Sequence, residues 1–358
     1  MCAVARFVRA DCIKNSHIDG RNIMSDKINR QENRQVLLVE KPTGKLGPEH
    51  FKMSNAAIPE PKDGEALVRV RYISLDAANR AWMHGATYRA AVEANTVMAG
   101  GGIAEVVSSK APGLAPGDIV FGDTGWQDYA AVPAKHLAKM PKVEPMTHLL
   151  SVYGIAGLTA YFGLLDVGKP KAGETVVVSA AAGSVGSIVG QIAKIKGCHV
   201  VGIAGGAEKC AYVRDELGFD ACVDHKSPRF AEEMKAALPN GLDGLFENVG
   251  GEPFAQCLRR LNDFARLAIC GLIASYEGAP TILPDMRIFL VRRIKIEGFI
   301  VADHLPLWPL ALRELASQVA SGRLRYRETV RQGLESAPQA LVDLLQGGNF
   351  GKMLVKLV

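Results

Sequence analysis

A glycine-containing turn at residues 180–186 carries the clearest chemical signal in the sequence. It joins a strand-like run, Val177-Val-Ser179, to a helix-like run that extends to Lys196. Small residues let the backbone approach a ligand closely, and amide groups at a helix N-terminus favour an anion. Strand, tight turn and helix in this order predict a dinucleotide-binding unit. The residues expected at the pyrophosphate are Gly183, Ser184, Val185 and Gly186.

The end of the next strand-like segment, His199–Ile203, bears on which dinucleotide is bound. A site for NAD usually has Asp or Glu at this strand end, where the carboxylate binds the ribose hydroxyls. The chain instead reads Gly202-Ile-Ala-Gly-Gly-Ala207, without a carboxylate, and Lys209 follows. A lysine here can bind a 2′-phosphate, although a solvated lysine at a helix start has the same pattern. We therefore predict NADPH as the cofactor.

The cysteines of this chain do not suggest a metal site. They stand at positions 2, 12, 198, 210, 222, 257 and 270, an odd count without C-x-x-C spacing. A tetrahedral zinc site needs four closely arranged nitrogen or sulfur ligands, and residues 13–197 contain no cysteine. We expect no metal, no disulfide framework and reduced thiols in a cytoplasmic protein.

A tyrosine is the candidate catalytic group. Tyr276 stands shortly after the strand-like segment Arg266–Cys270, and sheets of alternating strands and helices bind ligands beyond the carboxyl ends of their strands. A phenol there can donate a hydrogen bond to a substrate oxygen on which charge develops. A structural tyrosine on a loop is the alternative. Weaker candidates for the pocket lining are Ser275, Asn79, Trp82 and Tyr88.

The elements that must position these residues form two domains. The 358 residues are too many for one ordinary small domain. Residues 35–144 show short β runs separated by Gly/Pro turns, which is typical of a β-barrel. Residues 145–305 alternate strands and helices, which predicts a doubly wound parallel sheet, and residues 306–358 are expected to return to the first domain. Residues 1–34 are expected to be a disordered extension.

Composition excludes two classes of partner. Hydrophobic residues make up 48% and charged residues 22% of the chain, as in ordinary globular proteins, and no apolar run is long enough to span a bilayer. The net charge is +5, but residues 1–34 alone hold seven Lys/Arg and four Asp/Glu. Because the remaining charges are of both signs and dispersed, we expect neither nucleic-acid nor membrane binding.

Several motifs together resemble the zinc-independent medium-chain dehydrogenases/reductases, in particular the prostaglandin reductase, alkenal double-bond reductase and curcumin reductase group. The resemblance runs from about Gln35 to the C-terminus. Besides the turn at residues 180–187, the motifs are Gly157-Leu-Thr-Ala-Tyr161, Glu208-Lys209, Glu247-Asn-Val-Gly-Gly251, Ile269-Cys-Gly271, Gly298-Phe-Ile-Val301 and Gly348-Asn-Phe-Gly-Lys352. The resemblance implies a GroES-like β-barrel catalytic domain and a Rossmann domain, usually in a homodimer.

The resemblance also implies a set of cofactor contacts. Lys209 would bind the adenosine phosphate. His225 stands where similar enzymes have a tyrosine in that pocket, and a surface loop histidine is an equal alternative. The residues implied near the nicotinamide half are Thr159, Asn248, Cys270, Gly271, Phe299, Ile300, Val301 and Asn349.

The implied reaction is metal-free hydride transfer from NADPH to the C=C bond of an α,β-unsaturated ketone or aldehyde. Tyr276 matches the family's pocket tyrosine and would donate to the carbonyl oxygen. The family's segment Leu-Ser-Leu-Asp-Pro-Tyr-Met-Arg reads Ile73-Ser-Leu-Asp-Ala-Ala-Asn-Arg80 here. Ala78 therefore replaces a pocket tyrosine and leaves the substrate open. A quinone reductase and a non-catalytic NADPH-binding protein are the alternative functions.

Overall fold

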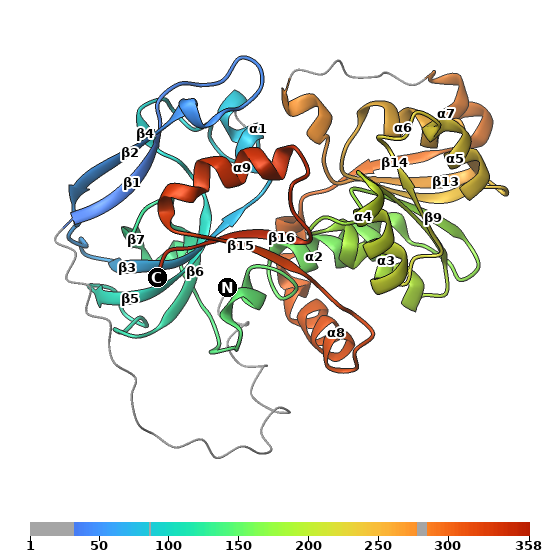
Figure 1. The fold of residues 1–358 in the computed structure, drawn as a ribbon. Helices are drawn as coiled ribbons and strands as arrows, with labels where there is room; N and C mark the ends of the chain where they lie inside the picture. The colour runs from blue at the N-terminus through green and yellow to red at the C-terminus, as the bar shows by residue number, and fades with distance from the viewer. Residues whose placement is uncertain (1–31, 86, 278–284) are drawn as a thin grey trace.

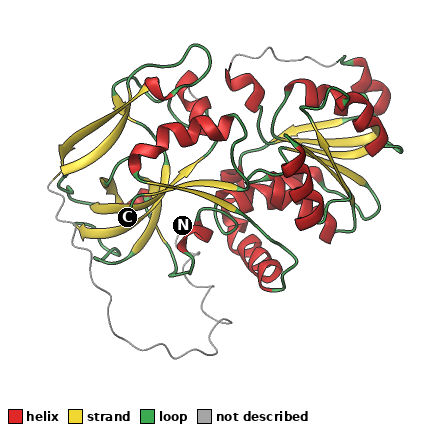
Figure 2. Cartoon of the chain, in the orientation of Figure 1, coloured by secondary structure: helices red, strands yellow, loops and turns green. Residues whose placement is uncertain are grey.

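Two domains lie side by side in the structure, a computed structural model that describes residues 32–85, 87–277 and 285–358 (Figure 1). One domain is built mainly of strands, and the other has a parallel sheet between helices (Figure 2). Within the described residues, no helix is both long and apolar enough to cross a membrane.

The first domain combines a seven-stranded and a three-stranded sheet in the described part of the chain. The larger has the order β15-β16-β3-β5-β6-β8, with β7 paired to β3, and the smaller has the order β2-β1-β4. Buried side chains such as Val68, Met98 and Trp126 fill the space between the sheets and α9. The elements are β1 (Glu32–Leu38), η2 (Pro48–His50), β2 (Phe51–Ala57), β3 (Glu65–Leu75), α1 (Ala78–His84), β4 (Thr96–Val97), β5 (Gly101–Ser109), β6 (Ile119–Asp123), β7 (Tyr129–Pro133), η3 (Ala134–His136), β8 (Ala138–Lys139), β15 (Glu328–Gln332), η9 (Leu334–Ser336), α9 (Ala337–Leu345) and β16 (Lys352–Lys356).

The second domain has a parallel sheet in the order β11-β10-β9-β12-β13-β14, the strand order of a Rossmann fold. Alternate residues of β9 face opposite layers: Val176 and Val178 pack with α3, whereas Val177 packs with α5 and α6. The elements are η4 (Met146–Leu149), α2 (Ile155–Phe162), η5 (Gly163–Gly168), β9 (Thr175–Ser179), α3 (Gly186–Ile195), β10 (His199–Ala204), α4 (Ala207–Ala211), η6 (Tyr212–Glu216), β11 (Ala221–Asp224), α5 (Phe230–Ala237), β12 (Leu242–Glu247), α6 (Gly251–Leu258), β13 (Leu261–Ile269), η7 (Ile273–Glu277), α7 (Arg287–Arg292), β14 (Lys295–Gly298), η8 (Val301–Leu307) and α8 (Trp308–Ala320).

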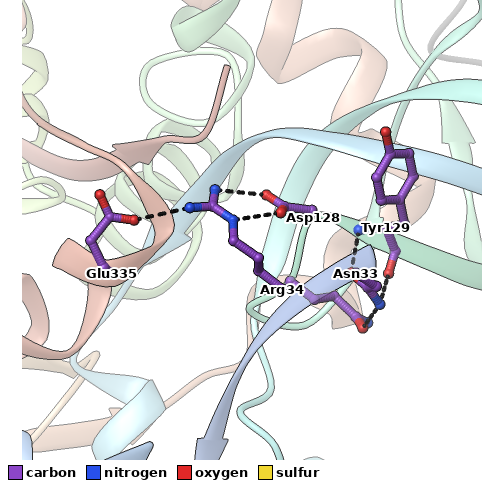
Figure 3. Close-up of polar contacts among 6 residues, drawn as sticks. Asn33, Arg34, Asp128, Tyr129 and Glu335 are labelled. Carbon is purple, nitrogen blue, oxygen red and sulfur yellow. Dashed lines mark hydrogen bonds and ion pairs between the residues drawn. The ribbon is translucent and has the colours of Figure 1, made fainter. Parts of the chain in front are cut away.

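The first strand begins at Glu32, three residues before the expected start of the first domain at residue 35. Asn33 is buried and exchanges two 2.9 Å hydrogen bonds with the backbone of Tyr129. Arg34 forms ion pairs with Asp128 and Glu335 (Figure 3). The prediction of a disordered extension is therefore wrong for residues 32–34, because Asn33 and Arg34 bond to residues far along the chain. Residues 1–31, including the segment 1–24, lie outside the described part.

The chain also returns to the first domain later than the expected residue 306. Helix α8 packs its Ala311 against Leu158 and Phe162 of α2, in the second domain. The return begins with β15, which pairs in parallel with β16, and β16 pairs antiparallel with β3. The boundary drawn from sequence is therefore wrong by about one helix, because an amphipathic helix does not reveal which domain it covers.

Candidate active site

A cleft of about 920 Å³ is lined by residues of both domains. It runs past the carboxyl ends of β9, β10 and β12, where the order of the parallel sheet reverses and such folds bind ligands. The residues that the sequence assigned to the cofactor or to catalysis all line it: Thr159, Gly183, Ser184, Val185, Gly186, Lys209, His225, Asn248, Cys270, Gly271, Tyr276, Phe299, Ile300, Val301 and Asn349.

The turn after β9 is shaped by close backbone packing. Ala180 has a positive φ of 49°, and a Cβ on Gly186 would lie only 2.4 Å from the Ala180 carbonyl oxygen. Only glycine fits there without a shift of the backbone. The Ser184 hydroxyl is buried, and no described residue bonds to it. The returning chain fixes the turn from outside through a bridge between Gly183 and Gly351.

Three basic side chains lie at the ends of β10 and β11. Lys209 is half-buried. Burial is the larger cause that lowers the pKa of its ammonium group, and the positive charge of Lys226 lowers this pKa further. His225 packs closely against Gly205, because a Cβ built on Gly205 would lie 2.8 Å from Nε2 of His225. The carboxylate of Asp224 accepts hydrogen bonds from the backbone amides of Gly206 and Lys226 and is absent from the cleft lining. This end of the cleft suits a phosphate dianion.

Asn248 is held at the end of β12 by Ser179 on β9. Its backbone N–H donates to the Ser179 hydroxyl oxygen at 2.7 Å, and its side-chain Nδ2 donates to the Ser179 carbonyl at 2.7 Å. Cys270 and Gly271 follow the neighbouring strand, where burial raises the pKa of the Cys270 thiol to about 12. Among the cleft residues, Asn349 is tied to its own loop by a 2.7 Å bond to Gly351.

Tyr276 lies over this same part of the cleft. Its hydroxyl oxygen is 3.8 Å from the position that a Cβ on Gly271 would take. His84 of α1 bonds to the Tyr276 carbonyl oxygen at 2.8 Å, so the catalytic domain holds the short helix η7. Burial raises the pKa of the Tyr276 phenol. The phenol therefore stays protonated and can donate a hydrogen bond at neutral pH.

The remaining wall belongs to the first domain. Ala78, Trp82 and Tyr88 line it, and Arg89 lies 4.5 Å from the centre of the Trp82 ring and pairs with Asp123 at 2.9 Å. Two candidates from sequence do not line the cleft: Asn79 and Ser275. Asn79 is buried and bonds to the Asp76 and Ala99 backbone, and Ser275 bonds to the Leu272 carbonyl.

No group of three or more metal-ligating side chains occurs among residues 32–85, 87–277 and 285–358. The glycines at the start of β5, where zinc enzymes of this superfamily would have a ligand run, are closely covered. A Cβ on Gly100 would lie 2.6 Å from Trp126 Nε1, and one on Gly102 would lie 2.7 Å from Thr124 Oγ1. Larger side chains would not fit at these positions without local movement.

These features fit NADPH. The turn offers close backbone approach and a buried hydroxyl, and basic side chains lie where the second strand provides no carboxylate. Sequence reasoning had missed Lys226, which follows β11 and lies beside Lys209. It had also missed Arg89 and the segment Gln346–Gly347. The position of Lys226 after a third strand was an available signal, whereas Gln346–Gly347 carried none.

Comparison with known proteins agrees with this geometry. Residues 34–140 match the family described as the N-terminal domain of oxidoreductase, and residues 184–317 match the one described as zinc-binding dehydrogenase. The chain is 42% identical to the NADPH-dependent curcumin reductase of Escherichia coli (strain K12), over 92% of this chain and 98% of that protein. It is 37% identical to the 2-alkenal reductase (NADP(+)-dependent) of Nicotiana tabacum, covering 90% and 97% of the two chains.

A solved structure gives the same result. CurA from Vibrio vulnificus in complex with NADPH superposes with a TM-score of 0.87 at 42% identity, over 91% of this chain and 99% of that one. The chain therefore belongs to the medium-chain dehydrogenase/reductase family, within the group of curcumin and 2-alkenal reductases. This confirms the resemblance, the two-domain fold class and the NADPH-dependent oxidoreductase class predicted from sequence.

Proposed function

We propose that this protein is an NADPH-dependent reductase of the C=C bond of α,β-unsaturated ketones or aldehydes. The observation that carries the proposal is the place of Tyr276, whose hydroxyl lies over Gly271 at one end of the cleft, while Lys209 lies among basic side chains at the other. The names of the related reductases, which act on curcumin or 2-alkenals, support the same reaction class.

Each part of the cleft has a proposed task. The turn of residues 183–186 binds the pyrophosphate, and Lys209, assisted by His225 and Lys226, binds the 2′-phosphate. NADPH, when bound, supplies the hydride. The residues proposed to hold its nicotinamide half beside the substrate are Thr159, Asn248, Cys270, Gly271, Phe299, Ile300, Val301 and Asn349.

Tyr276 is the proposed catalytic residue. As the β carbon of an enone gains a hydride, negative charge develops on the carbonyl oxygen. A phenol donor placed in advance stabilises this charge without reorganisation during the reaction. Because burial raises the pKa of Tyr276, the phenol keeps its proton for this task. The side chains of Trp82, Tyr88 and Arg89 form the wall around the rest of the substrate, and the small side chain of Ala78 leaves room beside them.

A substrate panel tests the proposed function. The purified protein is incubated with NADPH and an aryl enone, a 2-alkenal, a quinone or a saturated ketone, and the products are identified by mass spectrometry. Reduction of the enone or alkenal to the saturated carbonyl compound is the expected result. Turnover of the quinone alone, or of none of the four, would reject the proposal in favour of a quinone reductase or a binding protein.

The proposal also includes a cytoplasmic homodimer that does not bind nucleic acid. The five described cysteines are free, which suits a reducing compartment.

Strand β14 is at the edge of its sheet, and beside it Leu290 and Val291 of α7 are 80% and 65% exposed. An apolar surface beside an unpaired strand edge favours association with a second copy. Light scattering should give twice the chain mass, and Leu290→Glu should shift it towards the monomer, whereas a monomeric wild-type protein would contradict the dimer.

A further inference from the structure

Glu247 at the end of β12 is a buried carboxyl group for which the reaction itself has no use. Its side chain is fully buried, and none of the cationic groups in the described part of the chain is bonded to it. Oxygen Oε1 accepts hydrogen bonds from the Val249 amide at 2.6 Å, the Gly250 amide at 2.8 Å and the Ser179 hydroxyl at 2.9 Å. Oxygen Oε2 is buried, and no residue in the described ranges bonds to it.

These bonds place Glu247 between three segments of the cleft. Its side chain binds the end of β9 through Ser179 and the turn after β12 through Val249 and Gly250. Its backbone carbonyl accepts hydrogen bonds from the amides of Cys270 and Gly271, at 2.8 Å and 3.1 Å. One buried residue thereby connects the segments that carry Asn248, Cys270 and Gly271.

The Ser179 hydroxyl transmits this arrangement to Asn248. A hydroxyl has one hydrogen to donate, and with that hydrogen directed to Glu247 the oxygen is oriented to accept the Asn248 N–H. The Asn248 side chain gives one N–H to the Ser179 carbonyl. No donor among the described residues bonds to its amide oxygen. That oxygen is an acceptor available to a ligand in the cleft.

We propose that Glu247 is the positioning residue of the nicotinamide end: through Ser179 it fixes Asn248, and through its backbone it fixes Cys270 and Gly271, so that the reacting ring is held in register with the substrate. The proposal rests on the assignment of NADPH as cofactor. In this proposal Glu247 does not touch the cofactor or the substrate. Its role depends on the three hydrogen bonds that Oε1 accepts and does not require a negative charge on the carboxyl group.

The direction in which the pKa of the Glu247 carboxyl is shifted agrees with that role. Burial raises the pKa of the Glu247 carboxyl, because the charged form loses its hydration. A neutral carboxylic acid keeps Oε1 as an acceptor. An uncharged amide of the same shape should therefore replace it, whereas an apolar side chain of similar size should not.

The experiment compares Glu247→Gln with Glu247→Leu, using Glu252→Leu on α6 as the control, since Glu252 is exposed and bonds only within its own helix. Binding of adenosine 2′,5′-bisphosphate reports the adenosine end alone, and binding of NADP⁺ reports both ends. We expect Glu247→Leu to weaken NADP⁺ about tenfold and to lower kcat on an enone about thirtyfold, because Asn248 loses its anchor. Bisphosphate binding should change by less than about twofold, and Glu247→Gln should stay within about threefold of wild type in all measurements.

Equal losses of bisphosphate and NADP⁺ binding in Glu247→Leu would overturn the proposal, because they would mean general damage to the fold. Loss of kcat in Glu247→Gln as large as in Glu247→Leu would overturn it too, because charge would then be required. Ser179→Ala removes one link without disturbing the carboxyl. Ser179→Ala should lower kcat and should also weaken NADP⁺ binding. The double variant Ser179→Ala/Glu247→Leu should lose no more of either than Glu247→Leu alone. Additive losses would show that Glu247 does not act through Ser179. Enone reduction by the wild-type protein tests the proposed function separately.

Discussion

The Nζ of Lys209 donates a 2.6 Å hydrogen bond to the carbonyl oxygen of Gly347, 138 residues further along the chain. The same ammonium group lies 5.5 Å from the centre of the Phe350 ring. Lys209 belongs to the Rossmann domain and Gly347 to the segment that re-enters the catalytic domain, so the bond crosses the cleft. It holds a positive charge at the rim, beside the end of β10 that lacks a carboxylate.

Replacement of Lys209 should reduce the preference for NADPH over NADH. In Lys209→Ala the dissociation constant for NADPH should rise about 10- to 100-fold, equivalent to about 1.5–3 kcal/mol, because a charge-assisted bond to the 2′-phosphate is lost. NADH lacks this phosphate, and its affinity should stay unchanged. Fluorescence titration with both cofactors measures the two constants. Lys235→Ala, on the exposed side of α5, is the control, and equal affinity of the wild-type protein for NADPH and NADH would refute the assignment.

Removal of the Tyr276 hydroxyl should affect turnover more than binding. Tyr276→Phe keeps the ring and loses the donor, so kcat on an enone should fall about 10- to 1,000-fold, while NADPH affinity should remain nearly unchanged. Steady-state kinetics, together with a deuteride isotope effect that shows hydride transfer to be rate-limiting, provide the measurement. Tyr72→Phe removes the hydroxyl of a tyrosine on β3 that does not line the cleft, and it serves as the matched control. Unchanged turnover in Tyr276→Phe would leave this residue as part of the pocket wall only.

The pH dependence of turnover should reflect the buried phenol. Tyr276 works in its protonated form, and burial raises its pKa above the ordinary 10.0. A raised pKa extends the protonated range upward, so ionisation of Tyr276 should not lower kcat below about pH 10. A pH profile of kcat, corrected for protein stability at each pH, tests this. A Tyr276-dependent decline centred near pH 8 would contradict the assigned donor.

Chelators should leave the activity intact. The metal-free mechanism needs only a hydride donor and a hydrogen-bond donor, and the residues at the start of β5 are glycines, which carry no zinc-ligating side chain. Incubation with EDTA or phenanthroline, followed by desalting and an enone assay, should change kcat by less than about twofold. Activity that is lost and then restored by added zinc would show that the catalytic domain does bind a metal.

Two truncations should separate the N-terminal segment from strand β1. A protein that starts at Met24 should keep the wild-type melting temperature, because the residues before Met24 show no core-forming periodicity and precede the first strand-like run of the sequence. A protein that starts at Gln35 loses the buried Asn33 and the Arg34–Asp128 pair. Its melting temperature should fall by several degrees, consistent with about 2–4 kcal/mol for the lost buried bonds. Equal melting temperatures for the two truncations would mean that Asn33 and Arg34 contribute nothing.

Features that depend only on neighbouring residues were predictable from the order of the amino acids. The turn at residues 180–186 was predictable because strand, small residues and helix follow one another within one short segment. Helix α5, Phe230–Ala237, is a local feature of the same kind, because its apolar residues recur at helical spacing. The absence of a carboxylate after β10 is equally local, and together with Lys209 it led to the prediction of NADPH.

Only the tertiary structure decided which distant residues meet. Strands β14 and β15 are short, and their side chains are largely exposed, so no apolar alternation marks them; their pairing with β13 and β16 forms them. The placement of Tyr276 over Gly271, its attachment to His84 of the other domain, and the bonds of Asn33 to Tyr129 are likewise non-local. Such contacts join residues whose separation in sequence leaves no periodic trace, and burial strengthens the bonds between Asn33 and Tyr129.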